Sequence, residues 1–127
     1  MRAGDTFYPL SDVVSEHLWI VLTDPDEAGQ VAMANITTRR LDSDDSCLLD
    51  VSDHPFVRWE SAIAYEKARV APANALEQFI IKGMLQSRQP CSTDLLERVQ
   101  NGALASIFTP RGVKKSVRKQ LGIDAPP

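Results

Sequence analysis

The stretch from Asp53 to Arg58, DHPFVR, brings a carboxylate, an imidazole and a guanidinium together within six residues. An acid, a base and a fixed cation are what metal-free cleavage of a phosphodiester requires. His54 precedes Pro55, which favours an extended backbone and would direct the imidazole from a loop. Asp53 could orient that ring, and Arg58 could neutralise a developing charge. The same residues would also suit an ordinary turn in which Asp53 caps backbone amides, so both interpretations stay open.

A second cluster, NITTRR, runs from Asn35 to Arg40. The hydroxyl of Thr37 and the planar guanidinium groups of Arg39 and Arg40 are suited to binding phosphate oxygens. Alternatively, the threonines suit a strand, and the arginines face the acidic residues at positions 42, 44 and 45. The two clusters form one site only if they converge on one groove.

The charge of the chain is unevenly distributed. The chain has 127 residues, of which 43% are hydrophobic, and this size predicts one domain with a sizeable core. The net charge of -3 combines a net -9 in residues 1–66, from 13 acids and 4 Lys and Arg, with a net +6 in residues 67–127, from 4 acids and 10 Lys and Arg. The basic end could bind a polyanion, or the two halves could neutralise each other.

Several kinds of protein are not indicated by the sequence. No apolar run is long enough to span a membrane and the N-terminus lacks the pattern of a signal peptide, so we expect a cytoplasmic protein. Cys47 and Cys91 have no companions at metal-ligand spacing, so we expect no disulfide, no metal and no cofactor, with Cys47 in the core and Cys91 in a loop. Phosphate-binding glycine loops, nucleophile elbows and zinc-protease motifs are absent from the sequence.

The first half of the chain predicts short strands. We expect them at residues 5–8, 17–23, 30–36, 46–51 and 61–65. The second, HLWIVLT, is a continuous apolar run typical of a strand that is buried on both faces. Strands at this spacing, without helical patterns between them, predict a small and mostly antiparallel barrel.

The second half predicts about three helices. Ser92 to Asp94 offers caps for the second helix, and Thr109 is expected to cap the third, with Pro110 at its first position and Gly122 after its end. The residues expected on the apolar faces are Leu76, Phe79, Ile80 and Met84 in the first helix, Leu95, Val99, Ala103 and Ile107 in the second, and Val113, Val117 and Leu121 in the third.

The third helix also carries a basic face. Lys114, Lys115 and Arg118 could bind nucleic acid, or they could form an ordinary solvated face that complements the helix dipole. The second and third helices together could also act as a helix-turn-helix reader of duplex DNA. That alternative is weaker because the turn lacks the usual glycine.

Four segments resemble, in their order, the PemK/MazF growth-inhibitor toxins. These segments are GDTFY, LWIVLTDP, ANITT and SAIAYEKARV, and they cover roughly residues 4–72. Gly4 and Asp5 match the family's opening Gly-acid pair, and residues 36–38 match its Ile-Thr-Ser/Thr strand end, whose hydroxyl lies near the scissile phosphate. The resemblance implies a small SH3-like barrel that dimerises, cleaves RNA without a metal and is held in check by an antitoxin.

The resemblance also carries over to other positions, with one departure. Lys67 and Arg69 fall where the family has basic residues after its later strand. The loop PLSDVVSEH lacks the family's glycines and the Arg-Pro pair that helps to build the RNA site, and His17 stands close enough to substitute. DHPFVR is not part of the family motif, so its role is predicted from its chemistry alone.

Together these patterns predict a mainly β fold, with an antiparallel barrel and one helix in residues 1–90, which the resemblance implies is SH3-like, and a helical pair packed on it in residues 91–127. The leading hypothesis, which the resemblance implies, is a metal-independent endoribonuclease that acts as a homodimer on RNA and is bound by an antitoxin protein. The predicted catalytic residues are His54, His17, Arg39, Arg58 and Thr37, and the predicted nucleic-acid-binding residues are Arg40, Lys67, Arg69, Lys114, Lys115 and Arg118. The alternative is a non-catalytic barrel that binds a protein or nucleic acid.

Overall fold

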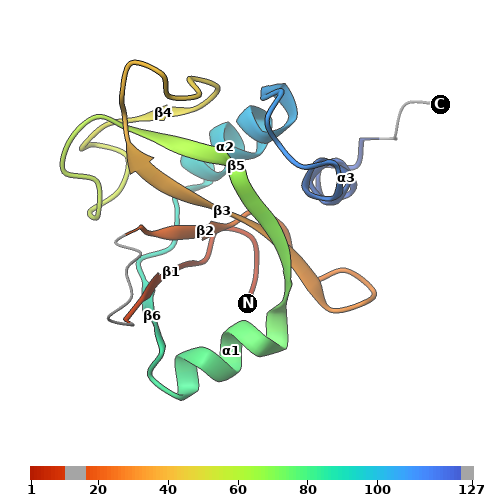
Figure 1. The fold of residues 1–127 in the computed structure, drawn as a ribbon. Coiled ribbons are helices and arrows are strands. Elements are labelled where there is room, and N and C mark those ends of the chain that lie inside the picture. The colour runs from red at the N-terminus through yellow and green to blue at the C-terminus, as the bar shows by residue number, and fades with distance from the viewer. Residues whose placement is uncertain (11–16, 124–127) are drawn as a thin grey trace.

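The computed structural model describes residues 1–10 and 17–123 as a curled six-stranded sheet with three helices (Figure 1). All strand pairs are antiparallel, and the strand order is β4-β5-β3-β2-β1-β6. The elements are β1 (Thr6–Pro9), β2 (Trp19–Val21), β3 (Gln30–Thr38), β4 (Leu48–Leu49), β5 (Ser61–Pro72), α1 (Ala73–Ile81), β6 (Leu85–Arg88), α2 (Thr93–Ala105) and α3 (Arg111–Gln120). The predicted fold class, mainly β with C-terminal helices, is confirmed.

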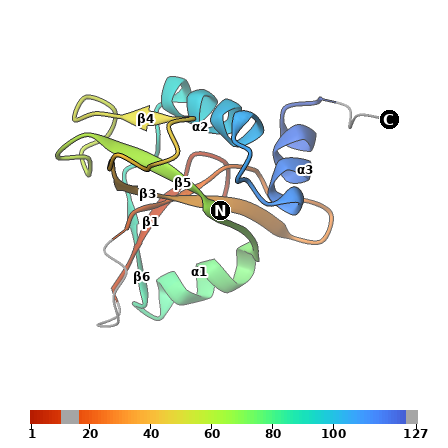
Figure 2. The same cartoon turned by 45° about the horizontal axis from the view of Figure 1, so that its top comes forward.

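The sheet is covered on both faces. Helices α2 and α3 lie on one side of it and α1 lies on the other (Figures 1 and 2). Successive residues of β2 belong in turn to two buried hydrophobic clusters, one on each face of the sheet. Ile20 belongs to the cluster that includes residues of α2 and α3, and Trp19 and Val21 belong to the cluster that includes residues of α1. This explains the unbroken apolar run around β2, which was predicted to be buried on both faces.

Strands β2 and β4 are shorter than the predicted segments 17–23 and 46–51, and β5 and β6 differ more. Strand β5 continues to Pro72, well beyond the predicted end at Tyr65. Strand β6 was not predicted at all, because its sequence LQSR is polar and largely exposed. It forms at the edge of the sheet through backbone pairing with β1, for which no apolar pattern is needed.

The helix ends also differ from the prediction. Helix α1 ends at Ile81, and Phe79 and Met84, predicted to be buried, are exposed. Helix α2 ends at Ala105, so Ile107 is 85% exposed and not part of the apolar face. Thr109 does not cap α3, whose N-cap is Pro110. The remaining residues of the predicted α2 face and the stripe of Val113 and Val117 are buried as predicted.

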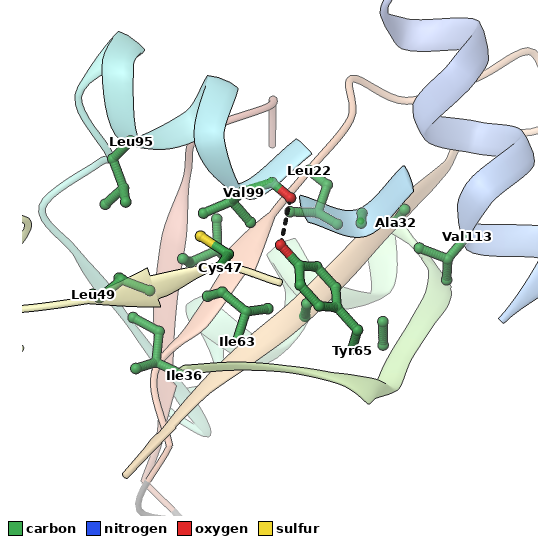
Figure 3. Close-up of a cluster of buried hydrophobic side chains, with 14 of the residues drawn as sticks. Leu22, Ala32, Ile36, Cys47, Leu49, Ile63, Tyr65, Leu95, Val99 and Val113 are labelled. Atoms are coloured by element: carbon green, nitrogen blue, oxygen red, sulfur yellow. Dashed lines mark hydrogen bonds between the residues drawn. The ribbon is translucent and has the colours of Figure 1, made fainter. Parts of the chain in front are cut away.

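Helix α2 approaches the sheet very closely at Gly102. The fully buried Tyr65 of β5 donates a hydrogen bond from its hydroxyl to the carbonyl of Val99, at 2.7 Å (Figure 3). A Cβ atom placed on Gly102 would lie 2.3 Å from that hydroxyl and 2.9 Å from the Cβ of Cys47. Glycine is therefore required here for close packing, although it lowers the helix propensity of α2.

The C-terminal end of α2 is fixed by Asp44, which lies in the loop between β3 and β4. Its carboxylate accepts hydrogen bonds from the hydroxyls of Ser106 and Ser46, at 2.5 and 2.6 Å. Burial opposes the ionisation of Asp44, but these hydrogen bonds outweigh it and the pKa of Asp44 is lowered. The ionised carboxylate thus joins the loop to the helix.

We predict that Gly102→Ala lowers the free energy of unfolding by about 1–3 kcal/mol, as overpacking typically does. The control is Gly112→Ala in α3, where a Cβ would contact nothing within 4 Å. That control should be neutral or stabilising by up to about 1 kcal/mol, because alanine has the higher helix propensity. Urea unfolding measures both variants, and a stable Gly102→Ala protein would contradict the close contact.

We predict a second effect at Asp44. Because its pKa in the folded protein lies below the ordinary value of 3.8, its contribution to stability is present above that pH and is lost as the pH falls through the folded pKa. Asp44→Asn should therefore be less stable than the wild type at pH 7, and the difference should shrink as the pH is lowered below about 4. Urea unfolding across this pH range measures it, and a difference that does not depend on pH would contradict it.

Candidate functional site

DHPFVR and NITTRR line the same groove. This groove has a volume of about 850 Å³ and lies between the end of β3, the loop that precedes β5, and the adjoining parts of β1 and β6. The described residues that line it include the arginines Arg40, Arg58 and Arg88, the aromatic residues Tyr8, Phe56 and Trp59, the hydroxyl residues Thr37, Thr38 and Ser61, and the histidines His17 and His54. The convergence of segments distant in sequence is a requirement for a site, and it is met here.

The groove is basic although the protein is acidic. Among the described residues, no Asp or Glu lines it, and none of its three arginines has a carboxylate within 4 Å. Asp42 and Asp44 instead line a smaller adjacent hollow of about 320 Å³, which Arg40 also borders. Within the described part of the chain, the groove therefore presents three guanidinium groups that no carboxylate pairs with directly.

His54 is a structural residue in this groove. It is only 5% exposed, and its Nε2 lies 2.6 Å from the carbonyl oxygen of Gln89. Its Nδ1 accepts a hydrogen bond from the backbone amide of Phe56, at 3.0 Å. A carbonyl can only accept, so the proton is on Nε2 and both ring nitrogens are occupied. His54 therefore connects the loop to the residue that follows β6. Because both of its ring nitrogens bond backbone groups, neither is available for the acid–base role predicted from the sequence.

Asp53 does not orient the imidazole of His54, as the sequence suggested. One carboxylate oxygen of Asp53 lies 2.6 Å from Nη1 of Arg98 on α2, and the other accepts from the backbone amide of Asp50. Arg98 also donates to the carbonyl of Leu48. The alternative prediction, a turn in which Asp53 caps a backbone amide, describes this part of the loop.

His17 is better placed for proton transfer. It is half-buried, and its Nδ1 lies 2.9 Å from the carbonyl oxygen of Ile36. Nδ1 must carry the proton in this bond, so in the neutral ring Nε2 keeps a lone pair. Within the described part of the chain Nε2 makes no hydrogen bond, and the ring lines the groove.

Other predicted residues lie outside the groove. Arg39 points to Glu60, at 3.6 Å, and not to the acidic residues at positions 42, 44 and 45. Arg69 on β5 lies over the ring of Trp19, 4.9 Å from its centroid. The residues of the predicted site that do not line the groove are Arg39, Lys67, Arg69, Lys114, Lys115 and Arg118.

Helices α2 and α3 do not form a hydrophobic core of their own. Val99 and Ala103 of α2 and Val113 and Val117 of α3 belong to the same buried cluster as the inner face of the sheet. An independent helix-turn-helix unit would need its own core, so the structure does not favour that alternative.

Three residues that line the groove were not among the site residues predicted from the sequence. Arg88 and its strand were not recognised, and Arg88 lies over the ring of Tyr8, 5.6 Å from its centroid. Tyr8 in turn packs against Phe56, with ring centroids 5.3 Å apart. Trp59 directly follows DHPFVR, and a tryptophan beside a candidate site was a signal that could have been used.

Residues 1–10 and 17–123 contain no group of three or more His, Cys, Asp or Glu that could hold a metal ion. In the same ranges no helix is both long and apolar enough to cross a membrane.

Cys47 is buried and Cys91 lies in the loop before α2, both as free thiols. Burial raises the pKa of Cys91 to about 11, so its thiol is a poor nucleophile at neutral pH.

We predict that His54→Ala lowers the free energy of unfolding by about 1–3 kcal/mol, since the amide of Phe56 loses its acceptor. Arg58→Ala, an exposed change in the same loop, should alter stability by no more than about 0.5 kcal/mol. Urea unfolding compares the two variants. Equal stability of His54→Ala and the wild type would contradict the structural role.

No protein-family model matches the chain, and no curated protein matches it. The similarity to the PemK/MazF toxins thus stays a prediction from short motifs, and the function has to be argued from the groove.

Proposed function

We propose that the groove binds single-stranded RNA and that the protein cleaves this RNA without a metal, as a PemK/MazF-like endoribonuclease. The observation that carries the proposal is the convergence of several aromatic rings, His17 and three arginines on one groove, in which no described carboxylate lies and no described carboxylate pairs with these arginines. Positive charge combined with aromatic rings is the usual composition of a site for single-stranded nucleic acid.

The arginines account for phosphate binding in this proposal. Arg40 and Arg58 come from the two segments predicted to contact phosphate, and Arg88 adds a third guanidinium from β6. Thr37 lies in the same groove and supplies a short hydroxyl donor. An antitoxin that covers this groove would be expected to present acidic residues to the arginines.

His17 is the proposed general base. Its Nε2 would accept the proton of the ribose 2′-hydroxyl as the 2′ oxygen attacks the adjacent phosphorus. The bond from phosphorus to the 5′ oxygen then breaks, and water gives a proton to the departing oxygen. The products are a 2′,3′-cyclic phosphate and a 5′-hydroxyl, and Arg58 or Arg40 would stabilise the negative charge of the phosphorane.

A second candidate function is binding of RNA without cleavage. It is favoured by one observation, which is that both ring nitrogens of His54 are occupied by backbone groups. Of the two histidines that line the groove, only His17 then has a ring nitrogen without a described partner, whereas the reaction benefits from both a base and an acid. The two candidates share the groove and differ only in whether the RNA remains intact.

We predict that binding of a short labelled single-stranded RNA weakens steeply with salt. Each phosphate contact contributes a slope of about -0.7 in a plot of log affinity against log salt, so three arginines predict a slope of about -2. Arg40→Ala combined with Arg58→Ala should reduce it to about -0.7. Fluorescence anisotropy measures the slopes.

The control for this experiment is Lys114→Ala combined with Lys115→Ala on α3, which removes two charges outside the groove. Its slope should equal that of the wild type. If the α3 variant loses binding and the groove variant does not, the RNA surface is on α3 and the proposed site is wrong.

We predict that cleavage persists in EDTA and that His17→Ala lowers its rate by about 10²- to 10⁴-fold, the usual contribution of a general base. The affinity for RNA should change little, because His17 is not one of the cations. Mapping of the product ends on a denaturing gel tests the 2′,3′-cyclic phosphate. RNA that binds with the predicted salt dependence but stays intact would exclude the enzyme and leave the second candidate.

A further inference from the structure

We infer that Trp59 is a stacking platform for an unpaired base, so that the groove recognises bases as well as phosphates. This inference rests on the proposed RNA groove and deepens it. The indole lines the groove and is 59% exposed, whereas Trp19, the other tryptophan, is 7% exposed. An indole with this much free surface in a ligand groove is suited to an aromatic partner.

The ring of Trp59 is fixed in place although it is exposed. Its Nε1 donates a hydrogen bond to the hydroxyl of Thr38 at the end of β3, at 2.9 Å. The carbonyl of the same residue accepts a hydrogen bond from the hydroxyl of Ser61, also at 2.9 Å. The polar atom of the indole is thus satisfied within the protein, and what remains for a ligand is the apolar ring surface. A ring held in this way loses little conformational entropy on binding.

The surroundings of the ring favour a nucleobase over a purely apolar ligand. Thr38, which holds the indole, is two residues from Arg40, and Arg58 directly precedes Trp59. Both arginines line the same groove. Guanidinium groups next to an aromatic surface match a nucleotide, whose phosphate is anionic and whose base is planar. In a duplex the bases are stacked on each other, so the site should prefer single strands.

The experiment compares a short single-stranded RNA with an abasic sugar-phosphate chain of the same length and charge. The wild type should bind the RNA about 5- to 150-fold more tightly than the abasic chain, the range that one stacked base supplies. Trp59→Ala should remove this preference and leave the affinity for the abasic chain unchanged. Trp59→Phe should retain part of it, because phenylalanine still stacks but cannot donate to Thr38.

Two further measurements make the result specific. RNA should quench the tryptophan fluorescence of the wild type, and Trp59→Phe should abolish this quenching because Trp19 is buried. Thr38→Val should reduce the preference for RNA over the abasic chain without changing the salt slope, since it frees the indole and removes no charge. A Trp59→Ala protein that still prefers RNA would overturn the inference.

The failure of this inference and the failure of the proposed function give different results. If Trp59→Ala binds RNA like the wild type while the double variant of Arg40 and Arg58 does not, the groove binds phosphates but Trp59 does not stack on a base. If the double variant also binds RNA like the wild type, the groove is not the RNA site and both proposals are wrong.

Discussion

The close approach of α2 to β5 is the contact on which the rest of the molecule depends. The hydroxyl of Tyr65 donates a hydrogen bond to the carbonyl of Val99, and at position 102 only a glycine leaves room for that hydroxyl. Because the tyrosine is fully buried, its hydroxyl needs a partner inside the protein, and this sets the position of α2 over the sheet. Burial also raises the pKa of Tyr65, so the hydroxyl remains a donor.

The position of α2 determines the walls of the groove. Arg98 extends from α2 to Asp53 and to the carbonyl of Leu48, and so holds the start of the loop that carries DHPFVR. His54 then binds the carbonyl of Gln89, in the segment that joins β6 to α2. The loop is therefore attached both to the helix and to the chain leading into it. Side chains that follow these two attachments, including Arg58 and Trp59, can face the groove without paying the entropic cost of ordering a free loop.

The distribution of ion pairs explains how an acidic chain has a basic groove. Arg39 and Lys119 each face a glutamate, Glu60 and Glu27 respectively, and none of these four residues lines the groove. The groove arginines have no such partners among the described residues. Charge counted along the sequence thus overstates the acidity of the site, because a ligand responds to the local field and not to the net charge.

The sequence by itself determined the elements whose apolar patterns are local, such as the doubly buried β2 and the stripe of Val113 and Val117. It also located both segments that line the groove, since a loop rich in charge and a strand end are recognisable by composition. Only the tertiary structure decided that His54 is structural, that Arg39 lies outside the groove, and that the polar β6 is a strand. These outcomes depend on partners far away in the chain, such as Gln89, 35 positions from His54. Residue types specify what a side chain can bind, but the packing of distant segments decides which partner it meets.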